Sequence, residues 1–155
     1  MNTEDRLAQV FRGREVAGPA SEAQIREIEE QLQVALPPSY RAFLARYGAA
    51  WLDAPYTIDG IRPDPEPGHT PLHGDVLAGN LTIRRHDSTG FFQKLVLITT
   101  DGSECFLYLD IAKAGPDGEC PVIVIAPGVD GLVVAPSFLE FVEKAAKSDP
   151  LDGVV

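Results

Sequence analysis

The stretch from Ser21 to Gly48, SEAQIREIEEQLQVALPPSYRAFLARYG, constrains the fold of this chain more than any other. Its first half carries apolar side chains at helical spacing, on Ile25, Ile28 and Leu32. Ser21 and Gln24 have the spacing of a capping box, in which each side chain bonds the backbone of the other residue. Because a proline disfavours the helical conformation of the residue before it, the proline pair at 37–38 predicts that this helix ends near Val34.

A second helix is predicted directly after this corner, with Pro38 in its first turn, where the missing N–H of proline is no loss. Its apolar stripe also has helical spacing and is mostly aromatic, on Tyr40, Phe43, Leu44 and Tyr47. Gly48 can adopt the left-handed conformation that closes a helix. We expect the stripe to pack in a core rather than stack on a ligand.

After the helix pair the chain changes to short apolar segments separated by turn residues. Strands are expected at 56–61, 95–99, 104–109, 121–126 and 132–135. Asp101-Gly102 is a hairpin signal, and Ser137 with Glu140 predicts the start of a closing helix. A short helix is expected at 3–11. The apolar residues within 75–86 match neither the helical spacing nor the alternation of a strand well, and we interpret this segment as a strand that runs into a turn or short helix.

Helices and strands that are segregated along a chain indicate an α+β fold. We predict an antiparallel sheet of about four to six strands, with the N-terminal helix pair and a C-terminal helix packed on it. The length of 155 residues predicts a single domain over 1–155, with a core at about 21–147. The segment around 63–71 is rich in proline and is expected to be an irregular loop.

The net charge of the chain is −10, and it is uneven. Residues 47–155 carry sixteen acidic and seven basic side chains, a net charge of −9. This argues against binding nucleic acid or an anionic membrane, whereas it permits a basic protein partner. Because the N-terminus has no leader pattern and the apolar runs are too short to cross a membrane, we expect a cytoplasmic protein. Cys105 and Cys120 are expected to be reduced structural thiols.

Residue types that carry catalysis or bind metals form no motif in this sequence. No G-x-S-x-G, P-loop or G-x-G-x-x-G pattern occurs. His69 and His73 lie in the proline-rich segment, without a third ligand at zinc spacing. Asp64 and Glu66 could pair as acid and base, but no nucleophile accompanies them, and solvated loop carboxylates are the favoured interpretation. We therefore predict no catalytic residues, no metal site and no cofactor.

The segment LPPSYRAFLARYG, followed by YTIDGI, resembles the SUKH superfamily, the group that includes the fungal cell-wall-synthesis regulators. The order downstream is also similar: LVLITTDGSECFLYLD, an acidic turn, PVIVIA, and SFLEFVEKAAK as the closing helix. The resemblance covers about residues 21–147, and LPxxYxxFLxxYG is its most specific part. It implies a binding module without catalytic residues. Many bacterial SUKH proteins resemble immunity proteins that bind a cognate toxin domain, often a nuclease or a deaminase, whereas others act as scaffolds.

The expected partner is therefore a protein, a basic toxin domain in the first interpretation, and the chain is expected to be a monomer or weak dimer. Loops project from a rigid sheet, so we expect them to supply the contacts. Trp51 and Phe92 are candidate aromatic anchors, although a core position at the end of the second helix is favoured for Trp51. The candidate carboxylates, for which a solvated surface is the alternative, are Asp53, Asp59, Asp64, Glu66, Asp75, Asp101, Glu104, Asp117 and Glu119.

Overall fold

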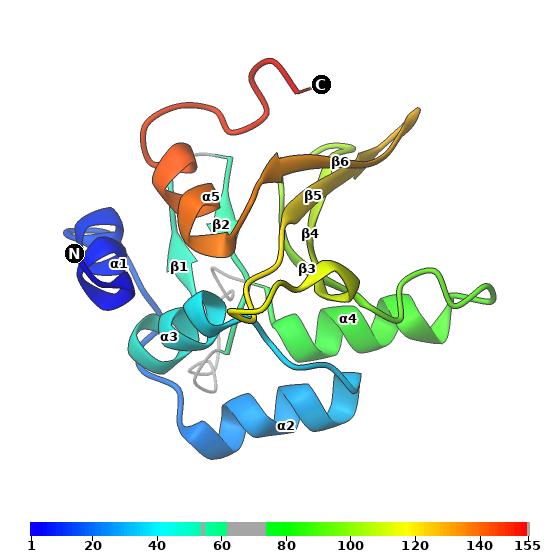
Figure 1. The fold of residues 1–155 in the computed structure, drawn as a ribbon, viewed down its shortest axis with the longest axis horizontal. Helices are drawn as coiled ribbons and strands as arrows, with labels where there is room; N and C mark the ends of the chain where they lie inside the picture. Colours follow the sequence, from blue (N-terminus) through cyan, green and yellow to red (C-terminus); the bar gives the residue numbers. More distant parts are fainter. Residues whose placement is uncertain (54, 62–73, 155) are drawn as a thin grey trace, which may run out of the picture.

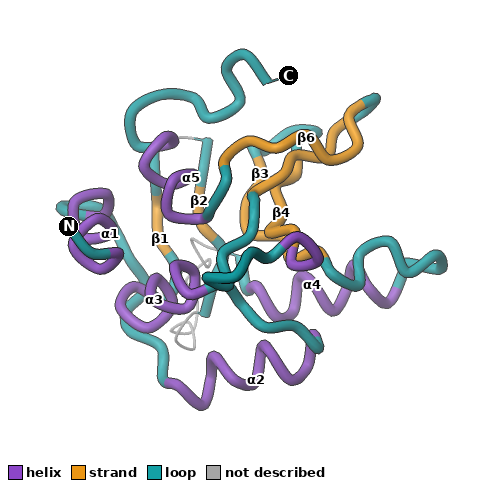
Figure 2. Tube along the Cα trace, in the orientation of Figure 1, coloured by secondary structure: helices purple, strands orange, loops and turns teal. Residues whose placement is uncertain are grey.

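The computed structural model describes residues 1–53, 55–61 and 74–154 (Figures 1 and 2). The helices in these ranges are α1 Thr3–Phe11, α2 Glu22–Leu32, α3 Pro38–Tyr47, α4 Val76–Arg85, the 3-10 helix η1 Ile111–Lys113 and α5 Phe138–Ala145. The strands are β1 Ala50–Trp51, β2 Thr57–Ile58, β3 Leu95–Thr100, β4 Phe106–Asp110, β5 Val122–Ala126 and β6 Val129–Ala135. The predicted α+β fold, with N-terminal helices, antiparallel strands and a C-terminal helix, is confirmed.

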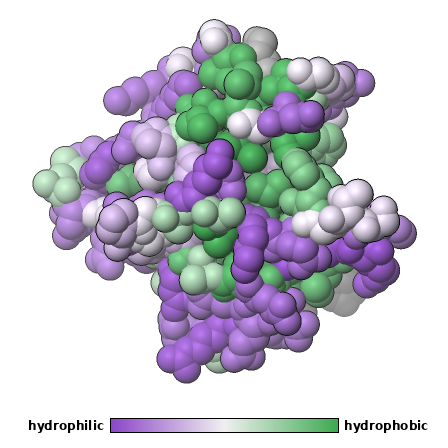
Figure 3. All heavy atoms as spheres, turned by 45° about the vertical axis from the view of Figure 1, so that its right-hand side comes forward, coloured by the Kyte–Doolittle hydropathy of each residue, from purple (hydrophilic) through white to green (hydrophobic). Residues whose placement is uncertain are grey.

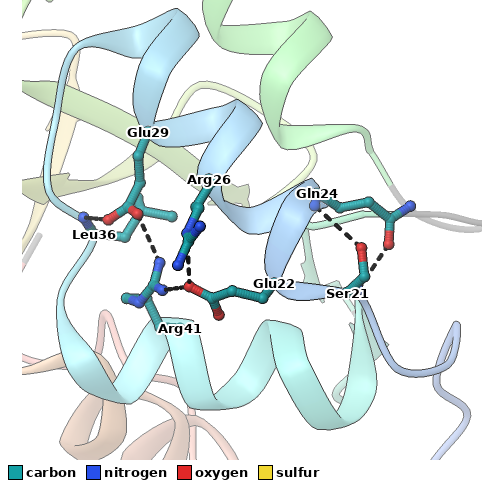
Figure 4. Close-up of polar contacts among 7 residues, drawn as sticks. All are labelled: Ser21, Glu22, Gln24, Arg26, Glu29, Leu36 and Arg41. Atoms are coloured by element: carbon teal, nitrogen blue, oxygen red, sulfur yellow. Dashed lines mark hydrogen bonds and ion pairs between the residues drawn. The ribbon is translucent and has the colours of Figure 1, made fainter.

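The helix pair forms as its sequence predicts. The Ser21 hydroxyl accepts a hydrogen bond from the Gln24 N–H at 3.1 Å, and the Gln24 side chain accepts one from the Ser21 N–H at 2.8 Å (Figure 4). Helix α2 ends at Leu32, close to the expected position. Pro38 is the first residue of α3, and Gly48 follows the helix with a φ of 72°, where glycine is favoured.

A network of charged side chains holds the two helices together across the proline corner (Figure 4). Arg41 of α3 forms ion pairs with Glu22 and with Glu29, at 2.7 Å for Glu29. The second carboxylate oxygen of Glu29 accepts a hydrogen bond from the Leu36 N–H at 2.8 Å. Glu29 therefore satisfies a backbone donor of the corner and binds the next helix at the same time.

The aromatic stripe of α3 packs in the core, as expected. Tyr40 and Phe43 are fully buried, and their rings lie 5.0 Å and 5.3 Å from the ring of Phe138 in α5. The ring of Phe11 in α1 lies 5.2 Å from Phe43. The Tyr40 hydroxyl donates to the Asp59 carbonyl at 2.6 Å, so the stripe also holds the chain that follows β2.

The four-stranded sheet has the order β3-β4-β5-β6, and each strand is antiparallel to its neighbours. One face contributes buried side chains to the main core, including Val96, Ile98, Leu107 and Val124. We call this the inner face. In Figure 1, α1, α3 and α5 lie to the left of the sheet, and α4 runs below it.

Two expectations about the middle of the chain are wrong. Residues 76–85 form the helix α4 throughout, rather than a strand that runs into a turn or short helix. The packed side of the helix includes a buried polar residue, Asn80. This polar residue interrupts the helical spacing of apolar residues by which an amphipathic helix is predicted from sequence. The strand expected at 56–61 is limited to β2, Thr57–Ile58, and its antiparallel partner β1, Ala50–Trp51, was not predicted.

Helix α4 closes one edge of the sheet. The Asn80 amide accepts from the Leu97 N–H at 2.7 Å and donates to the Leu97 carbonyl at 3.1 Å, so it takes the place of a neighbouring strand. The Ile98 carbonyl accepts from the Asp59 N–H at 2.8 Å. Arg84 donates to the Leu95 carbonyl at 3.4 Å. Side chains and a loop thus satisfy the backbone of β3 where a further strand would otherwise pair.

Candidate partner-binding surface

The outer face of the sheet is apolar as well. Leu95, Tyr108 and Ile123 are buried in a second cluster, separate from the main core, and Leu97 and Ile125 pack against it. An antiparallel sheet with one face on the core commonly carries polar side chains on the other face. Ile83 and Phe92 of this chain cover part of this apolar outer face, and it is open to solvent at exposed residues such as Phe106.

A groove lies between this face and α4. Its volume is about 570 Å³, and it is lined by Ala78, Gly79, Thr82, Ile83, Phe92, Leu97, Phe106 and Tyr108. We call it the outer groove. Figure 3, which brings the right-hand side of Figure 1 forward, shows hydrophobic atoms gathered in the upper and middle part of that side and hydrophilic atoms at the bottom. Phe106 is 39% exposed, so the groove presents aromatic surface to solvent.

A short loop after α4 positions Phe92. The Phe92 N–H donates to the Asp87 carboxylate at 2.8 Å, and the same carboxylate accepts from the Thr89 N–H at 3.1 Å. These hydrogen bonds, chiefly the one from Phe92, lower the pKa of Asp87, which keeps the carboxylate charged. The Phe92 ring lies 5.5 Å from the ring of Tyr108 on β4. The loop thus lays one aromatic side chain over another on the sheet.

The α4 wall of the groove carries small side chains. Ala78, Gly79 and Thr82 are exposed, and a Cβ atom added at Gly79 would meet no other atom within 4 Å. Asp75 caps the helix by accepting from the Ala78 N–H at 2.9 Å. Asn80 binds β3 from another side of α4, so Ala78, Gly79 and Thr82 face away from the contact between Asn80 and β3.

The structure places two of the predicted partner-binding residues at this groove. Phe92 lines it, and Asp75 caps the helix that forms its wall. The other predicted residues within the described ranges lie elsewhere, so these described members do not form one continuous site. Asp64 and Glu66 lie outside the described residues, as do His69 and His73.

A second group of predicted residues lies at the β3–β4 hairpin and beside β1. Desolvation raises the pKa of Asp101, but hydrogen bonds from Ser103 and Cys105 outweigh it and lower the pKa below its ordinary value. Glu104 is exposed in the same turn. Asp53 forms an ion pair with Arg14 at 3.0 Å and borders a small hollow of about 230 Å³. At this hollow the Tyr56 hydroxyl donates to Asp149 at 3.1 Å.

The remaining predicted residues have structural contacts. The Glu119 carboxylate accepts from the Ser39 N–H at 3.0 Å and from its hydroxyl at 2.7 Å, which caps the start of α3. Asp117 accepts from the Glu119 N–H at 3.0 Å within a turn. Trp51 is half-buried in β1, and Asp59 is half-buried beside the Tyr40 hydroxyl.

Sequence reasoning predicted only Phe92 among the residues that line the groove and missed Ala78, Gly79, Thr82, Ile83, Leu97, Phe106 and Tyr108. A signal for it exists in the strands. The runs LVLI, FLYL and VIVIA are apolar at consecutive positions, and consecutive strand residues point to opposite faces of a sheet. Such runs predict a sheet that is apolar on both faces, and one of those faces has to meet something other than the main core.

Both cysteines lie among the described residues, and neither has an activated thiol. Burial raises the pKa of Cys120 to about 12. Burial is also the largest cause that raises the pKa of Cys105, and the neighbouring Asp101 adds to it. Both thiols therefore resist ionisation. Within ranges 1–53, 55–61 and 74–154, no three or more His, Cys, Asp or Glu side chains are grouped so as to hold a metal ion. No helix in that part of the chain is long and apolar enough to cross a membrane.

A comparison with protein-family models matches residues 19–144 to the SMI1 / KNR4 family (SUKH-1). The match begins before α2 and extends to α5, so it includes the helix pair, both sheets and every residue that lines the outer groove. It agrees with the resemblance read from the LPPSYRAFLARYG segment. The chain therefore belongs to the SMI1/KNR4 family, SUKH-1.

Proposed function

We propose that this protein is a non-catalytic immunity protein of the cytoplasm that neutralises a cognate polymorphic toxin domain, a basic nuclease or deaminase, by direct binding. The observation that carries the proposal is the outer groove, an apolar surface open to solvent on a protein whose net charge is −10. Membership of SUKH-1 supports a binding role without catalysis. Aromatic side chains such as Phe92 and Phe106 supply the kind of contact that dominates protein interfaces.

Neutralisation in this proposal combines two physical effects. A nuclease or deaminase domain that holds nucleic acid carries a basic surface, and the acidic immunity protein is attracted to it over several ångströms. The apolar groove then excludes water from the contact and slows dissociation, because most affinity differences between related complexes lie in the dissociation rate. The bound protein blocks the toxin without any reaction on the toxin.

Co-expression with the toxin domain encoded beside this gene tests the proposal. Wild-type protein is expected to restore growth, and purified protein is expected to bind that domain. Phe106→Asp places a charge in the outer groove at an exposed position and is expected to weaken binding by at least about tenfold. Ala23→Asp adds the same charge at an exposed position in the first turn of α2 and is the matched control, expected to protect like wild type.

Growth that stays arrested with wild-type protein, together with no binding to the toxin domain, would contradict the immunity role. The alternative is a scaffold or regulatory module of the cell-wall-regulator type, a role with which membership of this family is also consistent. A scaffold is expected to associate stably with several cellular proteins and to give no protection. The two roles are therefore separated by the growth assay and by the number of partners recovered.

A further inference from the structure

We infer that the outer groove receives an amphipathic α-helix of the partner, with an apolar stripe in the groove and Lys or Arg residues on both sides of the stripe. The inference rests on the proposed binding role and specifies the chemistry of the segment that is bound. It follows from three properties of the groove: its walls, the closed edge of β3 beside it, and the charges around it.

The walls fit a helix. One wall is the helix α4, which presents the small residues Ala78, Gly79 and Thr82, and the floor is the sheet with Leu97 and Tyr108. Small side chains on one helix allow the backbone of a second helix to approach closely. Gly79 is unexplained by the fold itself, because a Cβ atom there would meet nothing within 4 Å. An approaching backbone supplies a reason for glycine at this position.

The edge of β3 argues against an extended peptide in the same place. A peptide that adds to a sheet as a strand needs free backbone N–H and C=O groups along the edge strand. In β3 the Leu97 N–H and carbonyl bond Asn80, the Ile98 carbonyl bonds the Asp59 N–H, and the Leu95 carbonyl bonds Arg84. Side-chain packing of a helix requires none of these groups.

The charges around the groove favour a basic helix. Asp75 is the residue before α4 and Asp87 is the second residue after it, and each accepts a hydrogen bond from the backbone of a residue that lines the groove. Two cations, one in α4 and one directly before β3, have backbone partners near the end of α2: Arg84 donates to the carbonyl of Leu32, and Lys94 donates to that of Gln33 at 3.4 Å. Arg85 is the exposed cation that remains on the last turn of α4.

A second copy of this chain fits these charges less well. Each copy carries a net charge of −10, so two copies repel each other, whereas a basic partner is attracted. The carboxylates at the two ends of α4 therefore select for Lys and Arg on a foreign helix.

The test uses a displayed library of 18-residue peptides, half of them on a helical frame and half on an extended frame, selected on the full-length protein. The expected enriched peptides have apolar residues at i, i+3, i+4 and i+7 and a positive net charge. Gly79→Gln places a long side chain in the groove from an exposed helix position, and we expect it to weaken binding of the selected peptides by at least about tenfold. Ala23→Gln, at an exposed position of α2, is the matched control and is expected to bind like wild type.

Several outcomes would overturn the inference: no enrichment, enrichment of extended or acidic peptides, or equal affinity for wild type and Gly79→Gln. A wild-type dimer in sedimentation that dissociates in Gly79→Gln would assign the groove to a second copy. The growth assay separates the two proposals. If Gly79→Gln still protects cells, the groove is not the toxin site and the immunity role stands. If the peptides bind as expected and wild-type protein does not protect, the groove inference stands and the immunity role fails.

Discussion

Single residues in this protein show how the same residue type can serve opposite needs. Gly60 follows β2 and lies against the backbone of Gly48, so that a Cβ atom there would collide with the Gly48 carbonyl oxygen. Gly79 lies in the middle of α4 with open space around it. Close backbone approach requires the first glycine, whereas within this chain nothing in the described structure requires the second.

The substitution Gly→Ala is therefore expected to change stability in opposite directions at these two sites. Gly79→Ala should raise the free energy of unfolding by about 0.5–1 kcal/mol, because alanine loses less conformational entropy than glycine in a helix. Gly60→Ala should lower it by about 2 kcal/mol or more, because backbone atoms have to move. Urea denaturation of the two variants measures both values. Equal effects of the two substitutions would contradict the packing seen at Gly48.

Asn80 gives a second prediction at this scale. It is 2% exposed, and its amide makes hydrogen bonds to both backbone groups of Leu97 and to the Val76 carbonyl. Asn80→Ala should lower the free energy of unfolding by about 2–3 kcal/mol, because buried backbone groups lose their partners. Thr82→Ala on the exposed side of the same helix is the control and should stay within about 0.5 kcal/mol. If both variants lost a similar amount of free energy of unfolding, any substitution in α4 would be destabilising, and the Asn80 hydrogen bonds would not explain the effect.

At the scale of elements, locally encoded structure was predictable from the sequence and long-range structure was not. The capping box at Ser21, the proline corner and the glycine after α3 act within a few residues, and each was predicted correctly. Helix α4 was mispredicted because its packed side depends on Asn80 meeting β3, a contact between residues 17 apart in the chain. The outer groove combines α4, two strands and a loop, so no single segment of sequence indicated it.

The charge pattern of the sequence does not show which carboxylates have partners within the fold, for a related reason. Glu119, one of the predicted partner-binding residues, accepts two hydrogen bonds from Ser39, 80 residues earlier. Pro37, the N-cap residue of α3, makes no side-chain hydrogen bond to the helix, so Glu119 supplies the cap from a distant turn. A carboxylate near a helix N-terminus is also stabilised by the helix dipole.

Glu119→Ala is accordingly expected to lower the free energy of unfolding by about 1–2 kcal/mol, in the range for loss of a helix cap. Glu104→Ala removes a carboxylate that is exposed in the β3–β4 turn, and it should change stability by less than about 0.5 kcal/mol. Chemical denaturation at neutral pH compares the two. If Glu119→Ala is as stable as wild type, the cap seen here contributes nothing to the stability of α3.

At the scale of the whole molecule, acidic charge and buried weak acids act together. The chain already carries a net charge of −10, so each further negative charge adds to its self-repulsion. Desolvation by burial is the largest cause that raises the pKa of Tyr40, Tyr56 and Tyr108 above the ordinary value, and nearby carboxylates add to it for Tyr40 and Tyr56. Burial likewise raises the pKa of Cys120 to about 12. The folded protein therefore holds these protons more tightly than the unfolded chain does.

This difference predicts a loss of stability at alkaline pH. From about pH 9 upward the unfolded chain releases its thiol and phenol protons at their ordinary pKa values, while the folded protein keeps them. The unfolded state then binds fewer protons than the folded state, so the free energy of unfolding falls as pH rises, by at least about 1 kcal/mol between pH 9 and pH 11. Urea denaturation at pH 8, 9, 10 and 11 measures the slope. Cys120→Val removes one of the buried acids at a similar side-chain size and should make the slope shallower, whatever its effect on stability at neutral pH. A free energy of unfolding that stays constant over this range would show that these groups ionise as easily in the folded protein as in the unfolded chain.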